Sequence, residues 1–201
     1  FTVGCRAARR TGPKESENFA VFGCGTIGIA TAIALKYFGA DKIMLCDLSE
    51  FRLKIVRQLG FQTCNTAEEN FCENAKKYFG EAYSLNGITA DIDGIIDASG
   101  SEEILPLFMK YGKVESRFTS VAVNKAIRKL DLLHLTFAQK SIIGSGGYMP
   151  EDVRDVMKIM KSRNWDIEQI ITHEFSLDEL EEALRTAGDT NAALNVIIKF
   201  E

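Results

Sequence analysis

The sequence has few features of a membrane-spanning or nucleic-acid-binding protein. No apolar run approaches the ~20 residues needed to cross a bilayer. No charged-then-apolar leader is recognisable, so we expect a cytoplasmic protein with no membrane partner. The net charge of −4 has the wrong sign for neutralising phosphates, and we therefore expect no nucleic-acid partner.

Cysteine and histidine are too scattered to predict a metal site. No two cysteines form a Cys-x-x-Cys pair, and their odd number favours free, buried thiols. Neither His134 nor His173 has a cluster of Cys, His or Glu at metal-ligand spacing, so we interpret both as structural. Because general acid–base and metal-assisted catalysis both need such side chains gathered in one place, we predict no catalytic residue and no metal ligand here. The cysteines are Cys5, Cys24, Cys46, Cys64 and Cys72.

The 201 residues, of which 46% are hydrophobic, suffice for one large domain or for one domain and part of a second. The first residue is Phe1 and not methionine, from which we expect a piece of a longer protein. Short apolar runs alternate with helical patterns from residue 19 to residue 163. Continuously apolar strands are typical of a parallel sheet covered on both faces. We predict an α/β fold, a doubly wound, parallel, six-stranded Rossmann sheet with right-handed crossovers.

The expected strands cover 19–22, 43–46, 61–64, 92–99, 118–123 and 141–143. The expected helices cover 1–10, 26–38, 49–59, 66–79, 101–111 and 150–163, with Pro106 disrupting the fifth. A capping box of Thr66 and Glu69 predicts the start of the fourth helix. Ser176 and Glu179 predict the start of another over 177–187. Short strands at 170–171 and 195–200 complete the expectation, the last with no assigned partner.

One motif carries chemistry. Residues 23–28 (GCGTIG) match G-x-G-x-x-G, follow a predicted strand and open a predicted helix. Gly23 allows the tight turn, Gly25 lets the backbone approach a pyrophosphate, and Gly28 lets the helix pack against the sheet. Asp47 stands 19 residues after Gly28, at the end of the next strand, where it would accept hydrogen bonds from ribose hydroxyls. A 2′-phosphate would meet its charge, so NAD is the expected cofactor rather than NADP.

Further candidates lie along the same edge of the predicted sheet. Arg52 could cover the adenine or the ribose, and Ser99 and Gly100 follow the fourth strand at its carboxyl end. Val121 and Val123 could line the nicotinamide side. Each has a plainer alternative: a strand–turn–helix corner for the glycines, a helix cap for Asp47, a solvated charge for Arg52 and core packing for the valines. The predicted cofactor-binding residues are Gly23, Gly25, Thr26, Ile27, Gly28, Asp47, Arg52, Ser99, Gly100, Val121 and Val123.

The run from Val21 to Gly60 resembles the zinc-containing medium-chain dehydrogenases. It contains Gly23, Gly25, Ile27 and Gly28, then Lys36, Gly39 and Ala40, then Asp47, Arg52, Leu59 and Gly60, at the places of the family pattern. Residues 97–100, 140–148 (KSIIGSGGY) and 170–184 (IITHEFSLDELEEAL) also match, the last two most like the sorbitol, butanediol and threonine dehydrogenase branch.

The resemblance implies only the nucleotide-binding half of such an enzyme. Residues 1–164 would form the NAD-binding domain, with 1–11 as the end of an interdomain helix. Residues 165–201 would be the C-terminal segment of an otherwise absent GroES-like catalytic domain, in which the zinc is expected. The full-length protein would transfer a hydride between NAD and a secondary alcohol or polyol, whereas this part would be inactive. The resemblance also implies a homodimer formed through residues 141–148.

Two positions depart from the family pattern, and two other functions stay open. Relatives usually carry Gly-Gly before the fifth strand, where this chain has Gly112-Lys113 followed by an extended segment. Many carry a basic residue before the final strand, where this chain has Asn195. The alternatives are a zinc-free quinone-type reductase half and a non-enzymatic dinucleotide-sensing module. A methyltransferase is disfavoured because Phe22, not an acid, precedes Gly23.

Overall fold

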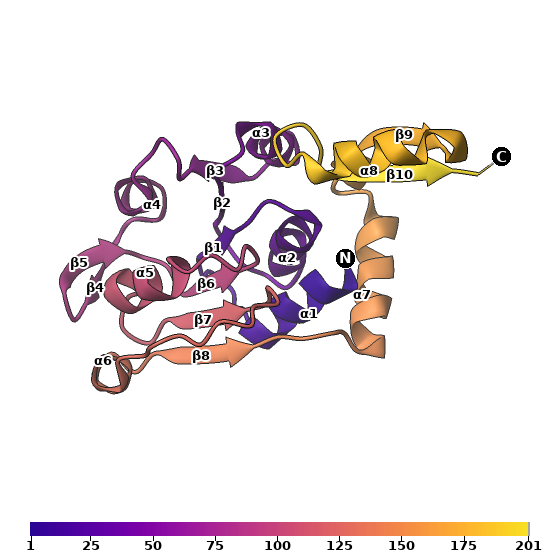
Figure 1. The fold of residues 1–201 in the computed structure, drawn as a ribbon. Coiled ribbons are helices and arrows are strands. Elements are labelled where there is room, and N and C mark those ends of the chain that lie inside the picture. The colour runs from indigo at the N-terminus through magenta and orange to yellow at the C-terminus, as the bar shows by residue number, and fades with distance from the viewer. Residues whose placement is uncertain (201) are drawn as a thin grey trace.

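The computed structural model describes residues 1–200 (Figure 1). Six parallel strands form one sheet in the order β3-β2-β1-β6-β7-β8. They are β1 (Phe19–Phe22), β2 (Ile43–Asp47), β3 (Gln62–Asn65), β6 (Gly94–Asp97), β7 (Arg117–Ser120) and β8 (Ser141–Gly144). This confirms the predicted doubly wound, six-stranded parallel fold. Because chain order reverses beside β1, the loops after β1 and β6 diverge and leave a crevice at the carboxyl edge.

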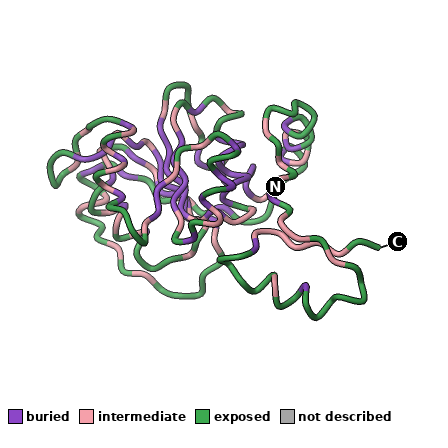
Figure 2. The backbone as a smooth tube through the Cα atoms, turned by 90° about the horizontal axis from the view of Figure 1, so that it is seen from above, coloured by how far each residue is buried: buried purple, intermediate pink, exposed green. Residues whose placement is uncertain are grey.

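Helices cover both faces of the sheet, as the continuously apolar strands require. One face packs against α1 (Thr2–Thr11), α2 (Thr26–Tyr37), α3 (Glu50–Gln58) and α7 (Pro150–Ser162). The other packs against α4 (Phe71–Phe79) and α5 (Ile104–Tyr111). Figure 2 shows buried backbone concentrated along these strands and α2. Helix α2 is buried on nearly all sides because the sheet lies on one side and α1 on the other.

An ion cluster joins α1 to α7. Asp152 is fully buried and accepts hydrogen bonds from Arg9 Nε (2.8 Å) and from the Met149 backbone (2.8 Å). Arg9 also pairs with Asp155, and Arg6 with the exposed Glu151. The carboxylates of Asp152 and Asp155 raise the pKa of Arg9, so its charge is fixed. These ion pairs therefore hold α1 against α7 on one face of the sheet.

The C-terminal tail forms a small unit beside the sheet. Strand β9 (Ile171–Ser176) pairs in parallel with β10 (Asn195–Lys199), and α8 (Leu180–Gly188) connects them. Short 3₁₀ turns at Ile167–Ile170 and Leu177–Glu179 precede β9 and α8. The predicted Ser176–Glu179 capping box is confirmed: the Ser176 backbone donates to Glu179 Oε2 at 2.9 Å. The last strand therefore has a partner, which the sequence had not assigned.

Several boundaries differ from the sequence prediction. Helix α4 begins after Asn70, whose side chain accepts from the Glu73 backbone (3.2 Å), and not at Thr66. Glu69 bonds back to the Asn65 backbone (2.9 Å) in a turn, so the predicted capping box is wrong. Pro106 does not disrupt α5, because it lies in the first turn, where its missing N–H leaves no helix bond unmade.

The sequence analysis did not predict a short hairpin and a short helix. A hairpin of β4 (Glu81–Ser84) and β5 (Gly87–Ala90) follows α4, and α6 (Leu132–Phe137) precedes β8. Leu85 and Asn86 form the turn, and Gly87 follows as the first residue of β5 with φ +105°, so residues typical of turns were present in the sequence. Strand β7 ends at Ser120, three residues before the predicted end at Val123.

Candidate functional site

A crevice of about 920 Å³ opens at the carboxyl ends of β1, β2 and β6. The corner between β1 and α2 forms one wall. The turn after β6 and the first turns of α3 and α5 form others, and Thr190 and Asn191 of the tail reach its rim. Of the predicted residues, Gly23, Gly25, Asp47, Arg52 and Ser99 line this space. The structure therefore brings five of the predicted residues together around one crevice.

The glycine corner is a strand-to-helix junction of close backbone packing. Gly23 has φ +100°, a conformation that side chains rarely adopt. A Cβ on Gly28 would lie 1.8 Å from the Gly23 carbonyl oxygen, so only glycine brings α2 this close to the strand end. A Cβ on Gly25 would meet no protein atom within 4 Å. Protein atoms therefore lie close to Gly23 and Gly28, whereas the space beside Gly25 holds no protein atom.

The start of α2 presents the positive end of the helix to the crevice. Gly25 is the N-cap and has no side chain to accept from the first amides, and Thr26, Ile27 and Gly28 carry no charge. The first N–H groups of a helix have no partner within the helix, and they add to the positive end of its dipole. This geometry is suited to an anion such as a phosphate.

Asp47 ends β2 with its carboxylate turned to the same corner. Oδ2 accepts from the Cys24 backbone at 2.6 Å, and Oδ1 accepts from the Ser49 backbone at 2.9 Å. These bonds hold the carboxylate at the crevice edge while leaving lone pairs for a hydroxyl donor. Arg52, on the first turn of α3, also lines the crevice, and within residues 1–200 its buried Nε has no hydrogen-bond partner.

The turn after β6 is built around Asp97, which sequence reasoning did not single out as a site residue. Its buried Oδ1 accepts from the backbones of Ser99 (2.9 Å) and Gly100 (2.8 Å) and from the Ser99 hydroxyl (2.8 Å). The three bonds fix the loop that faces the glycine corner. Gly100 itself has φ +75° and stands behind Ser99, outside the crevice lining.

The remaining predicted residues lie beside the crevice or away from it. Thr26, Ile27 and Gly28 follow Gly25 along α2, and Val121 is buried directly after β7. Val123 is 97% exposed in the loop beyond β7 and does not line the crevice. The tail supplies contacts that the sequence gave no signal for: Asn195 accepts from the Thr26 hydroxyl at 2.7 Å, and the Ser49 hydroxyl donates to the Thr190 carbonyl at 3.1 Å.

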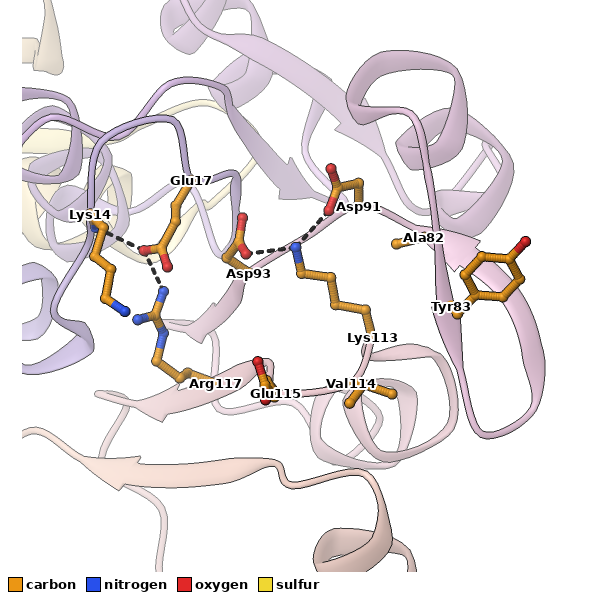
Figure 3. Close-up of a pocket in the computed structure, with 10 residues that line it drawn as sticks. All are labelled: Lys14, Glu17, Ala82, Tyr83, Asp91, Asp93, Lys113, Val114, Glu115 and Arg117. Atoms are coloured by element: carbon orange, nitrogen blue, oxygen red, sulfur yellow. Dashed lines mark hydrogen bonds and ion pairs between the residues drawn. The ribbon is translucent and has the colours of Figure 1, made fainter.

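A second, smaller pocket of about 370 Å³ lies at the opposite, amino-terminal ends of β1, β6 and β7 (Figure 3). Its charges largely pair with one another. Lys113 Nζ lies 2.6 Å from both Asp91 and Asp93, and Arg117 lies 2.6 Å from Glu17. These pairs attach the 12–18 loop and the segment before β7 to the sheet, so we assign them a structural role.

Metal ligands are not gathered anywhere in the described chain. Within residues 1–200, no three His, Cys, Asp or Glu side chains stand close enough together to hold a metal ion. Within the same residues, no helix is both long and apolar enough to span a membrane.

The fold and the corner define a Rossmann-type α/β domain with a crevice at its topological switch point. Comparison with known families identifies it further. The zinc-binding dehydrogenase family model matches residues 26–162, and the chain belongs to that family.

Sequence relatives within the family are dehydrogenases of alcohols and polyols. Sorbitol dehydrogenase 1 of Saccharomyces cerevisiae is 22% identical over 184 residues, covering 91% of this chain and 51% of the relative. (R,R)-butanediol dehydrogenase of the same yeast is 26% identical over 180 residues, covering 86% and 45%. The chain thus spans about half the length of the curated relatives it matches.

Solved structures share the fold. A short chain alcohol dehydrogenase from Escherichia coli CFT073, complexed with the cofactor NADH, superposes with a TM-score of 0.83 at 18% identity. The match covers 99% of this chain and 57% of that one. At this identity the likeness establishes the shared architecture.

Proposed function

We propose that this chain binds NAD and forms the cofactor-binding part of a zinc-dependent alcohol or polyol dehydrogenase. The observation that carries the proposal is the open corner at Gly25, which faces a crevice edged by the Asp47 carboxylate. The bound NADH of the E. coli structural neighbour and the names of the sequence relatives support it. Transfer of a hydride between NAD and a secondary alcohol would be the reaction of the full-length protein.

The crevice fits the parts of a dinucleotide in order. The pyrophosphate would lie against Gly25 and the amides that begin α2, where a Cβ would otherwise fill the space. The adenosine ribose would donate hydroxyl protons to Asp47, and the unpaired Arg52 Nε would face the adenosine side. Ser99, fixed by Asp97, would border the cofactor on the far side, with Gly100 shaping the turn.

When bound, the nicotinamide supplies the hydride acceptor. This chain's residues would bind and orient it: Thr26, Ile27 and Gly28 carry the helix amides, while Val121, buried directly after β7, would stand toward the nicotinamide end. The described residues do not fit a zinc site. We propose that the zinc and the substrate pocket belong to a catalytic domain outside this sequence, and that this chain binds cofactor without turnover.

The domain division follows the same proposal. Residues 1–164 would form the cofactor domain, and residues 165–201, which include the β9–β10 unit, would complete a GroES-like domain. The outer edge of β8 ends the strand order, and its Ser141 and Ile142 side chains are exposed. We propose that residues 141–148 pair with a second copy across this edge, which analytical ultracentrifugation tests. A monomer at all accessible concentrations would refute the dimer.

Isothermal titration calorimetry with NAD and with NADP tests the cofactor assignment. We expect NAD to bind more tightly, because a 2′-phosphate would meet the Asp47 carboxylate. Tighter binding of NADP would overturn the choice of cofactor and favour a quinone-type reductase. Binding of neither would overturn the proposed function of this crevice.

A further inference from the structure

Two cysteines face each other at the carboxyl ends of β2 and β3. In the parallel register Cys46 is the partner of Cys64, so both side chains leave the same face of the sheet. Neighbouring strands lie roughly 4.8 Å apart, and a disulfide spans Cα separations of about 4.4–6.8 Å. The backbone spacing therefore allows a bond between these two residues.

The two thiols already interact. Burial and, as the smaller cause, the neighbouring Cys64 thiol raise the pKa of Cys46, whereas the Cys46 thiol lowers the pKa of Cys64. Asn74 Nδ2 lies 3.8 Å from the Cys64 sulfur and donates to it. The Cys46 thiol is the main cause that lowers the Cys64 pKa, and the Asn74 amide adds to it, whereas burial and Glu69 act in the opposite direction. Cys64 is thus the more nucleophilic member of the pair.

One member of the pair lies in the wall of the crevice, and the other is fully buried behind it. Cys46 lines the crevice and directly precedes Asp47, and Cys64 is buried beside it in the same apolar cluster. Cys24 belongs to the cluster on the other face of the sheet, and Cys72 lies half-buried on α4. Of the five cysteines, only 46 and 64 are register partners on adjacent strands.

We propose that Cys46 and Cys64 form a reversible disulfide when the protein is exposed to hydrogen peroxide. The Cys64 thiolate attacks one oxygen of hydrogen peroxide, so that an S–O bond forms and the O–O bond breaks. The leaving hydroxide takes up the proton lost by Cys64 and becomes water. Cys46 then attacks the sulfenic sulfur, the S–S bond forms, and the departing hydroxide leaves as water with the Cys46 proton. Two thiols are oxidised, and one peroxide is reduced to two waters.

The bond would alter the crevice at its adenosine side. Pulling the two sulfurs together removes the Asn74 contact and draws in the strand ends that carry Asp47 and Asn65. If the crevice binds NAD as proposed, the disulfide should weaken NAD binding. Bound NAD should in turn cover Cys46 and slow the formation of the disulfide. The disulfide itself does not depend on NAD.

Peptide mapping of the folded protein after hydrogen peroxide treatment tests the proposal. We expect one cross-linked peptide pair joining Cys46 to Cys64, a fall of two in the thiol count, and recovery of both thiols with dithiothreitol. Cys72→Ser is the matched control, because it removes the half-buried thiol at the crevice and should leave the cross-link intact. Cys46→Ser and Cys64→Ser should each abolish it while circular dichroism shows the fold retained.

Oxidation of Cys46 or Cys64 to sulfinic acid without a cross-link would overturn the proposal, as would a cross-link of either residue to Cys72. So would complete resistance of both thiols under conditions that oxidise Cys72. The mapping uses unmodified protein, so its result does not depend on any variant folding. If calorimetry shows no NAD binding, the proposed function fails and the mapping still decides the disulfide. If NAD binds but oxidation proceeds at an unchanged rate, the inferred link between the thiols and the cofactor fails.

Discussion

The Thr26 hydroxyl, on the first residue of α2, donates a 2.7 Å hydrogen bond to the amide oxygen of Asn195, the first residue of β10. The bond links the proposed pyrophosphate corner to a strand that is 169 positions away in sequence. It also directs the hydroxyl proton away from the crevice. A phosphate at the helix start would compete for that proton, because it too accepts hydrogen bonds.

Charge at residue 195 should therefore tune NAD affinity. We expect Asn195→Lys to tighten NAD binding roughly two- to fivefold, since a partly exposed ion pair contributes about 0.3–1 kcal/mol. Asn195→Asp should weaken it by a similar factor. Calorimetry at low and high salt measures both, with adenosine as the control ligand because it lacks phosphates. Equal changes in the affinity for adenosine would show that residue 195 does not act through the phosphates.

Gly25→Ala and Gly28→Ala form a matched pair of variants. Gly25 has φ −75° and free space around its missing Cβ, so alanine should leave the free energy of unfolding almost unchanged. It should nevertheless reduce NAD affinity by about tenfold or more, because the methyl group fills the place proposed for the pyrophosphate. Unaltered NAD affinity in Gly25→Ala would argue against phosphate binding at this corner.

Gly28→Ala should show the opposite profile. Its Cβ would lie 1.8 Å from the Gly23 carbonyl oxygen, so the corner must move. We expect the free energy of unfolding to fall by about 1–3 kcal/mol, the usual cost of overpacking. Urea denaturation of the two variants side by side separates the stability effect from the binding effect.

The buried carboxylate on α7 should matter far more than its exposed neighbour. Asp152→Ala leaves Arg9 without its main partner and should lower the free energy of unfolding by about 2–3 kcal/mol, less than for a fully buried pair because Arg9 is partly exposed. Glu151→Ala breaks only the exposed pair with Arg6 and should cost less than about 1 kcal/mol. Urea denaturation measures the free energy of unfolding of both variants. Equal decreases for the two would contradict the assigned burial of Asp152.

Lys140 should make stability depend on pH in the alkaline range. It is buried at the end of α5, where Nζ donates to the Phe108 and Met109 carbonyls, and burial lowers its pKa to about 8. The unfolded chain keeps the ordinary value of 10.5 and binds more protons between pH 8 and 10.5. The contribution of this residue to the free energy of unfolding therefore rises with pH across that window.

Lys140→Met isolates this contribution. Urea denaturation at pH 8 and pH 10 should show a gain in the parent protein, relative to the variant, as the pH increases. The variant also loses the two hydrogen bonds to α5, which shifts its stability at every pH but not the slope. Parallel curves for the two proteins would show that Lys140 titrates normally.

The central strands and the glycine corner could be predicted because their signals are local. Continuous apolar runs define β1, β2 and β6, and the spacing from Gly28 to Asp47 defines one crossover. The start of α4 could not be assigned in the same way, because Thr66-x-x-Glu69 and Asn70-x-x-Glu73 both fit a helix start. The structure chooses Asn70 because Glu69 is engaged with the Asn65 backbone.

Contacts between segments far apart in the chain could not be predicted from the sequence. Nothing local indicates that Asn195 meets Thr26 or that Thr190 meets Ser49, since each depends on how β10 pairs with β9. The exposure of Val123 had a similar cause. Its apolar neighbours suggested a longer strand, but the loop leaves the sheet after Ser120, where β8 ends alongside it.

The tail's reach to the crevice has a thermodynamic consequence. Because Thr190 and Asn191 border the same space as Gly25, and Asn195 bonds to Thr26 next to it, substitutions in the two segments should have non-additive effects on ligand affinity. Occupancy of the crevice should in turn protect the β9–β10 amides from hydrogen exchange, although those strands lie outside it. Ligand binding in the crevice and the ordering of the C-terminal tail would then be thermodynamically coupled.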